Sequence, residues 1–150
     1  MSERILKALM QMFAIIAKED GVTNTGRNIV HSFLKQLLNQ EMVEQYLKIF
    51  DTYFEEHHKI SQKKEGAAKR TSLGSVKILK ICTQINTELE QKQKMVVLVR
   101  LIEFIYSNNE ISEQEYEFVS TVSEAFNIQQ DEFFLLFDFV RSSKDVVSES

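Results

Sequence analysis

Residues 95–126, MVVLVRLIEFIYSNNEISEQEYEFVSTVSEAF, decide the fold that this sequence predicts. Apolar residues recur every three or four positions up to Ile105 and again from Phe118 onward, which is typical of two amphipathic helices. A polar turn separates the two helices. After it, Ser112 and Glu115 match a capping box, in which the side chain of each accepts a hydrogen bond from the backbone N–H of the other. The stretch therefore predicts a helix, a turn and a second helix.

The same pattern occurs earlier in the chain, where Thr23 precedes Ser112 by 89 positions. At this offset, apolar residues match through three helices and two turns. The matched pairs are Leu9 with Leu98, Phe13 with Ile102, Ile16 with Ile105, Val22 with Ile111, Val30 with Val119, Phe33 with Val122, Leu37 with Phe126, Leu47 with Leu136 and Phe50 with Phe139. Any two amphipathic helices can be aligned by sliding, but the equal spacing of the turns favours a duplicated three-helix unit.

Composition agrees with a helical fold. The 150 residues include no proline and four glycines, whereas an all-β fold needs many tight turns built from these two residue types. We predict an all-α protein, a compact bundle of about seven helices with an internal pseudo-repeat. We expect one helical domain over residues 1–142 and a loose polar tail over 143–150, a possible linker to a further domain, with the last helix ending near Arg141. Lost periodicity over residues 57–72 predicts a mobile surface connection, with a frayed helical extension as an alternative for its start, followed by one extra helix.

Charge, cysteine content and hydropathy narrow the class of protein. The net charge of −4 gives no overall attraction to nucleic acid or anionic lipid. The single cysteine, Cys82, lies among isoleucines and leucines, which predicts a buried thiol and a reducing compartment. The start of the chain lacks a secretory signal, and no apolar run has the length needed to span a bilayer. We expect a cytoplasmic protein.

The two turns also carry a family resemblance. They read Lys18-Glu19-Asp20-Gly21-Val22-Thr23 and Ser107-Asn108-Asn109-Glu110-Ile111-Ser112-Glu113-Gln114-Glu115. With these turns the chain resembles, from about Leu6 to Val140, the TerB-like domains, small all-helical modules named after a tellurite-resistance protein. More narrowly, residues 77–86, KILKICTQIN, look like the TerB-like region that opens some large bacterial ABC-type ATP-binding proteins. The resemblance implies a place at the N-terminus of such a protein, with ATP hydrolysis in a downstream domain.

In the family, the acidic turns are thought to hold a divalent cation, which prefers several converging oxygen ligands. The first turn offers Glu19 and Asp20, but Gly26 and Arg27 stand where the family pattern has Glu. The second turn has Asn108-Asn109 in place of Asp-Gly and keeps Glu113 and Glu115, which also suit the first turn of a helix. We therefore expect no metal and no cofactor, and keep cation sensing as an alternative.

A positive segment is the second candidate site. Within residues 59–80 the bases are Lys59, Lys63, Lys64, Lys69, Arg70, Lys77 and Lys80, among which Lys63, Lys64, Lys69 and Arg70 are the candidate partner-binding residues. Such a stripe suits an anionic surface, an acidic partner or a phosphate group, but it is equally typical of a solvated linker. Because aromatic residues for base stacking are missing, we expect no nucleic-acid binding, and keep it as an alternative.

The stretch Phe133-Phe134-Leu135-Leu136-Phe137-Asp138-Phe139-Val140 is apolar on nearly all sides of a helix. Either it forms the central helix of the domain, or it is half-exposed and covered by another domain or a second copy. Agreement with Tyr46, Leu47 and Phe50 in the earlier copy favours the central position.

No activated nucleophile, paired acid and base or phosphate-binding loop can be named in the sequence. We therefore predict that the protein is not an enzyme but an interaction or regulatory module. Its expected partner is a protein or a downstream domain of the same chain, and a homodimer is possible. Membrane contact is expected only indirectly, at the inner face of the membrane, through the larger ATP-binding protein.

Overall fold

The computed structural model describes residues 2–17, 24–63, 67–108 and 111–149, and their backbone confirms the predicted all-α class. Within these ranges no strand occurs. The helices are α1 (Glu3–Ile16), α2 (Asn24–Leu37), α3 (Gln40–Lys63), α4 (Ala67–Glu88), α5 (Gln91–Ile105), the 3-10 turn η1 (Tyr106–Asn108), α6 (Glu113–Ala125) and α7 (Gln130–Glu149). None of the described helices combines the length and apolar character required to cross a bilayer.

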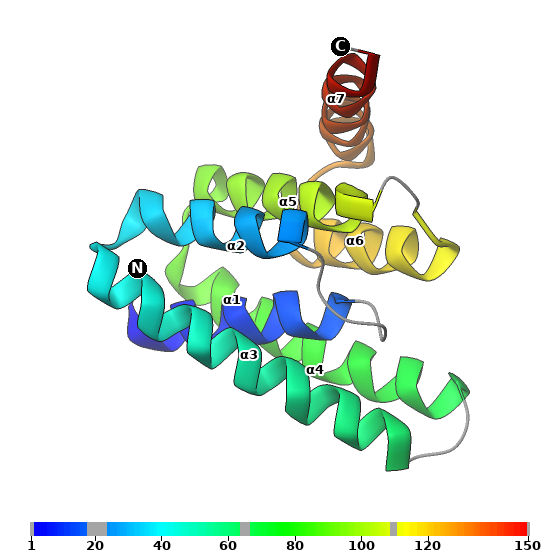
Figure 1. Cartoon of the computed structure of the whole chain (residues 1–150). Coiled ribbons are helices and arrows are strands. Elements are labelled where there is room, and N and C mark those ends of the chain that lie inside the picture. The colour runs from blue at the N-terminus through cyan, green and yellow to red at the C-terminus, as the bar shows by residue number, and fades with distance from the viewer. Residues whose placement is uncertain (1, 18–23, 64–66, 109–110, 150) are drawn as a thin grey trace.

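Helices α1 and α5 form the centre of the bundle (Figure 1). Helix α1 packs against α3 and α4, while α5 packs against α2, α6 and α7. Their apolar stripes meet at Phe13, whose ring lies 5.4 Å from that of Phe104 on α5 and 6.0 Å from that of Phe33 on α2. Phe104 in turn lies 6.4 Å from Phe50 on α3. One aromatic cluster therefore joins four helices.

Local side-chain chemistry explains where several helices begin and end. The hydroxyl of Ser2 accepts a hydrogen bond from the Ile5 N–H at the start of α1, and the Asn39 side chain accepts one from the Met42 N–H at the start of α3. Such bonds satisfy N–H groups that have no partner within the helix. Helix α6 ends before Asn127, whose positive φ of 59° turns the chain toward α7.

Helix boundaries follow the offset of the sequence repeat. Helices α1, α2 and α3 correspond to α5, α6 and α7, and each first copy starts 88 to 90 positions before its counterpart. The packing of the third helices differs, however. Helix α3 runs along α1, whereas α7 rises away from the end of α5 and α6 (Figure 1). The repeat thus describes the secondary structure better than the tertiary arrangement.

Two expected irregular segments are helical. The continuation of α3 to Lys63 agrees with a helical extension at the start of residues 57–72, but the irregular connection predicted for the rest is wrong, because α4 begins at Ala67. The last helix does not end near Arg141, and α7 continues through the expected polar tail to Glu149. In residues 57–72, Lys, Gln and Ala have high helix propensity and favour a helix without apolar periodicity, whereas the sequence of residues 142–149 does not explain the extension of α7. Loss of apolar periodicity in these two segments therefore did not mark the end of a helix.

Candidate interaction surfaces

The acidic turns do not form a complete cation site within the described part of the chain. Glu19, Asp20 and Thr23 lie outside the described residues. Arg27, which stands where the family pattern has Glu, donates a hydrogen bond to Asp51 on α3 and joins α2 to α3. Both side chains are more than 40% exposed, so this ion pair adds little stability.

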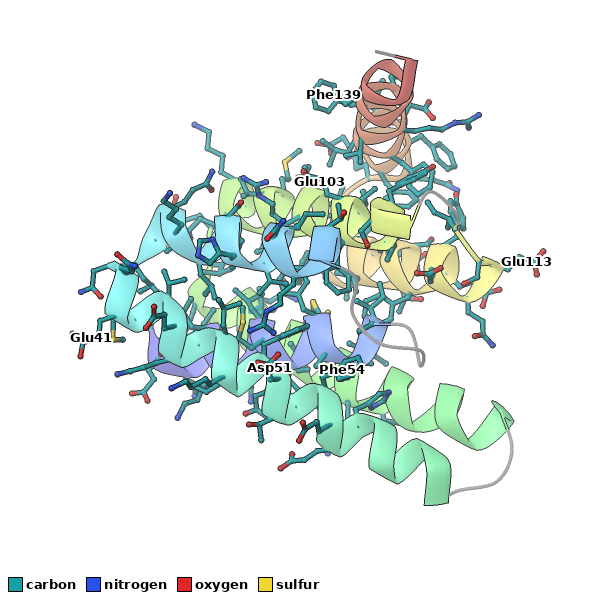
Figure 2. All side chains as sticks on the ribbon, viewed as in Figure 1. Glu41, Asp51, Phe54, Glu103, Glu113 and Phe139 are labelled. Carbon is teal, nitrogen blue, oxygen red and sulfur yellow. The ribbon has the colours of Figure 1, made fainter. Side chains whose placement is uncertain are left out.

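The second turn uses one of its carboxylates as a helix cap. The Ser112 hydroxyl accepts from the Glu115 N–H at 3.1 Å, and the Glu115 carboxylate accepts from the Ser112 N–H at 3.0 Å. The predicted capping box is therefore confirmed. Glu115 is buried, whereas Glu113 extends from the start of α6 into solvent (Figure 2). The two carboxylates do not converge, and no group of three or more possible metal-ligating side chains occurs among the described residues.

Replacement of Ser112 by alanine tests this cap. Ser112→Ala removes the hydroxyl acceptor at the start of α6 and should lower the free energy of unfolding by about 1 kcal/mol. Urea denaturation of the purified protein measures the change. Ser32→Ala, at an exposed position on α2, serves as the control and should change stability by less than about 0.5 kcal/mol. Equal stability of the two variants would contradict the cap.

Cys82 and the histidines do not form a reactive site. Cys82 is only 1% exposed among the apolar side chains of the core, as predicted. Burial raises the pKa of its thiol to about 12, so the nucleophilic thiolate is strongly disfavoured. His57 is half-buried on α3, His31 is exposed on α2, and the side chain of His58 lies outside the described part of the structure.

The candidate basic residues lie at the ends of two helices. The backbone places Lys63 at the last position of α3, and Lys69 and Arg70 in the first turn of α4. Lys64 and the side chains of the other three lie outside the described residues. These ends of α3 and α4 extend beyond the rest of the bundle (Figure 1). Lys63, Lys69 and Arg70 therefore lie close in sequence on the two helix ends, and the interactions of the candidate bases stay a prediction.

Helix α7 is not the central helix, which corrects the sequence interpretation. Its inner face, Phe133, Leu136, Phe137 and Val140, packs against the bundle, with Phe133 and Val140 buried. The Phe137 ring lies 5.5 Å from that of Tyr106 and 5.3 Å from that of Tyr116, which fixes α7 against η1 and α6. The helix thus uses one of its apolar faces to bind its own domain.

The opposite side of α7 is an exposed apolar surface. Leu135 is 71% exposed and Phe139 67% exposed, and Phe134 beside them is also exposed. Figure 2 shows Phe139 projecting from the side of α7. We call Phe134, Leu135 and Phe139 the outer face of α7. In the repeat, Leu135 and Phe139 correspond to Tyr46 and Phe50, which are buried on α3. The similar sequences of α3 and α7 therefore did not reveal that Leu135 and Phe139 are exposed while Tyr46 and Phe50 are buried.

A second exposed strip, which sequence reasoning missed, runs along α5. Val96 is 49% exposed, Lys92 is exposed, and Met95 and Val99 are half-buried. Next to them, Arg100 forms an ion pair of 3.3 Å with Glu103. We call Lys92, Val96, Val99 and Arg100 the outer strip of α5. The repeat could have indicated an exposed apolar residue on α5, because Val96 stands where the first copy has the charged Lys7 on α1.

A polar network also escaped sequence analysis. Lys94, although only 7% exposed, donates from Nζ to the Asn86 side-chain oxygen at 3.1 Å. The Asn86 amide donates to the Ala125 carbonyl at 2.8 Å, and Gln91 donates to the Phe126 carbonyl at 3.0 Å. These bonds join the junction of α4 and α5 to the end of α6. This hydrogen-bond network stabilises the region where α6 ends and α7 begins.

Substitutions of Asn86 test how much this hydrogen-bond network contributes to stability. Asn86→Ala removes the acceptor of the buried Lys94 ammonium group and should lower the free energy of unfolding by about 1–3 kcal/mol. Asn86→Asp retains an oxygen for Lys94 and should lose less stability than Asn86→Ala. Thermal and urea unfolding of both variants give the comparison. A smaller loss for alanine than for aspartate would contradict the proposed contribution of the Lys94 bond.

The fold defines the class of this protein as a small all-helical domain with a repeated helix-turn-helix pattern. A comparison with protein-family models matches residues 6–136 to the family described as "Tellurite resistance protein TerB". The chain therefore belongs to the TerB family, as its turns indicated. Neither the curated proteins nor the solved structures compared with the chain contain a match.

Proposed function

We propose that this TerB-family domain is a non-catalytic interaction and regulatory module of a larger bacterial ABC-type ATP-binding protein. The observation that supports the proposal is the outer face of α7, where Leu135 and Phe139 are about two-thirds exposed although both are large and apolar. Contiguous exposed apolar side chains are typical of surfaces that bind another protein. The similarity of residues 77–86 to the opening region of such ATP-binding proteins supports the choice of parent.

The rigid inner face of α7 supports the same role. Because Phe137 contacts the rings of Tyr106 and Tyr116, the helix presents its outer face without folding on binding. A preformed surface loses less conformational entropy in a complex than a disordered segment does. The proposed module acts in the cytoplasm, at the inner side of the membrane where its parent is membrane-associated.

Binding to the ATP-binding region of the parent protein tests the proposal. We expect calorimetry to detect a complex, and the combined substitutions Leu135→Asp and Phe139→Asp to weaken it at least tenfold. Leu79→Asp on α4 replaces another exposed apolar residue and should leave the affinity unchanged. A parent reading frame without a phosphate-binding loop, or equal affinities of the two variants, would contradict the proposal.

A further inference from the structure

The outer face of α7 and the outer strip of α5, in which Val96 is the exposed apolar residue, correspond to parts of α3 and α1, two helices that pack together in the first copy of the repeat. There, α3 runs along α1, with Tyr46 and Phe50 buried. Tyr46 lies close enough to Lys7 and Glu3 for their charges to affect its pKa, which burial raises most strongly. At the 89-position offset, Val96 corresponds to Lys7, Leu135 corresponds to Tyr46 and Phe139 corresponds to Phe50. In the second copy, Leu135 and Phe139 are mostly exposed and Val96 is 49% exposed, while Val99 is half-buried.

We propose that the outer face of α7 packs across the outer strip of α5 in a second copy of this chain, and that the reciprocal contact forms a two-fold symmetric dimer. In this dimer, Leu135 contacts Val96 of the other copy, and these two residues stand at the positions that Tyr46 and Lys7 occupy on α3 and α1. Phe139 lies further along the strip, near Val99. The inference rests on the proposed function, since it uses the same outer face. It adds a second copy as a partner, which would compete with the ATP-binding region of the parent for that face.

A second copy fits better than closure of α7 onto its own α5. The inner face of α7 is already engaged, with the Phe133 ring 5.9 Å from that of Tyr116 and Val140 only 3% exposed. Rotation of α7 to bring Leu135 against its own α5 would expose this inner face, so little net apolar surface would be buried. Contact with a second copy covers the outer face and keeps the inner face buried. Reciprocal contacts between the same two surfaces are the property of a closed two-fold interface.

Charge supports the same pairing. The outer strip of α5 carries Lys92, besides Arg100, which already pairs with Glu103, whereas the exposed side of α7 carries Asp131 and Asp138 on either side of Leu135. In the first copy, the position equivalent to Lys92 is Glu3, which lies near Tyr46. By this correspondence Lys92 approaches Leu135 and the two aspartates of the other copy. Opposite charges at the edge of an apolar contact favour the correct orientation of the partners.

Sedimentation of the full chain measures the mass of the species in solution and so tests whether a dimer forms. We expect a reversible species of twice the 17.5 kDa chain mass over a concentration range of about 1–100 µM. Leu135→Asp, Phe139→Asp and Val96→Asp should each raise the dissociation constant at least tenfold. The matched control is Leu79→Asp, because Leu79 and Val96 are both 49% exposed. It should sediment like the unmodified protein. A monomer at every concentration would overturn the dimer.

Cross-linking tests the contact itself. A chain with Val96→Cys is mixed with a chain with Leu135→Cys and oxidised, while buried Cys82 stays in both as a shielded thiol. We expect a disulfide-linked heterodimer in the mixture and far less covalent dimer in either chain alone. In a single chain with both substitutions, formation of only an intrachain disulfide would show closure of α7 onto its own α5 and would overturn the proposal.

The dimer and the proposed function can fail separately. If the chain is monomeric but Leu135→Asp still weakens binding to the ATP-binding parent, the dimer is wrong and the interaction module stands. If the chain dimerises through Leu135 but the parent binds both variants equally, the proposed function is wrong and the dimer stands.

Discussion

Phe13→Ala is expected to lower the free energy of unfolding by about 3–5 kcal/mol, the range found for large-to-small changes at fully buried aromatic positions. Phe13 is completely buried and contacts the rings of Phe33 and Phe104. Its removal leaves a cavity where α1, α2 and α5 meet and also removes the edge-on ring contact with Phe104. For a domain of typical stability, this loss leaves little margin against unfolding at ambient temperature.

Guanidinium or urea denaturation measures this effect, with Phe139→Ala as the matched control. Phe139 is 67% exposed, so its truncation should change the free energy of unfolding by no more than about 0.5 kcal/mol. The comparison is made at a protein concentration too low for self-association, because dimer formation stabilises the folded state. A loss below about 2 kcal/mol for Phe13→Ala would contradict the central place of this ring.

The thiol of Cys82 is expected to react with a disulfide reagent about a thousandfold more slowly in the folded protein than in the unfolded chain at pH 8. Burial raises its pKa from 9.0 to about 12, so the thiolate fraction falls by roughly three powers of ten. The rate is followed spectroscopically in buffer and again in denaturant, where the ordinary rate should return. Stoichiometric reaction of the folded protein within the mixing time would contradict the burial of Cys82.

The same shift predicts a pH dependence of stability. Because the folded pKa is raised, the contribution of the protonated thiol is fully present below about pH 9 and is lost as pH rises toward 12, where the unfolded chain ionises first. One thiol changes the free energy of unfolding by up to about 1.4 kcal/mol per pH unit in this window. Cys82→Ala should lose less stability than the unmodified protein between pH 9 and 11. Identical slopes would contradict the shift.

Much of the secondary structure was predictable because local signals and apolar periodicity agree. The capping box at Ser112 and the helices on either side of it appear where the sequence placed them. Their hydrogen bonds join residues three positions apart, so no tertiary information is needed to predict them. Residues 57–72 were predicted less well, since most of their described backbone is helical although the apolar periodicity is lost.

The candidate surfaces were less predictable because they depend on packing between distant residues. The apolar residues of α7 are compatible with two faces, and only contact with Tyr106 and Tyr116 decides that Phe137 lies inside and Leu135 outside. Similarity to α3 suggested the opposite. In the same way, no local pattern connects Lys94 with Asn86 and the Ala125 carbonyl, because these residues meet only in the folded bundle.

The most direct test of the exposed outer face of α7 compares two substitutions at equivalent positions of the repeat, Phe50→Asp and Phe139→Asp, by denaturant unfolding of the dilute monomer. Phe50 is completely buried and Phe139 is 67% exposed. We predict that Phe50→Asp prevents stable folding, because it buries an unpaired charge, while Phe139→Asp changes the free energy of unfolding by less than about 0.5 kcal/mol. Severe destabilisation by Phe139→Asp would place this side chain in the core and contradict the account.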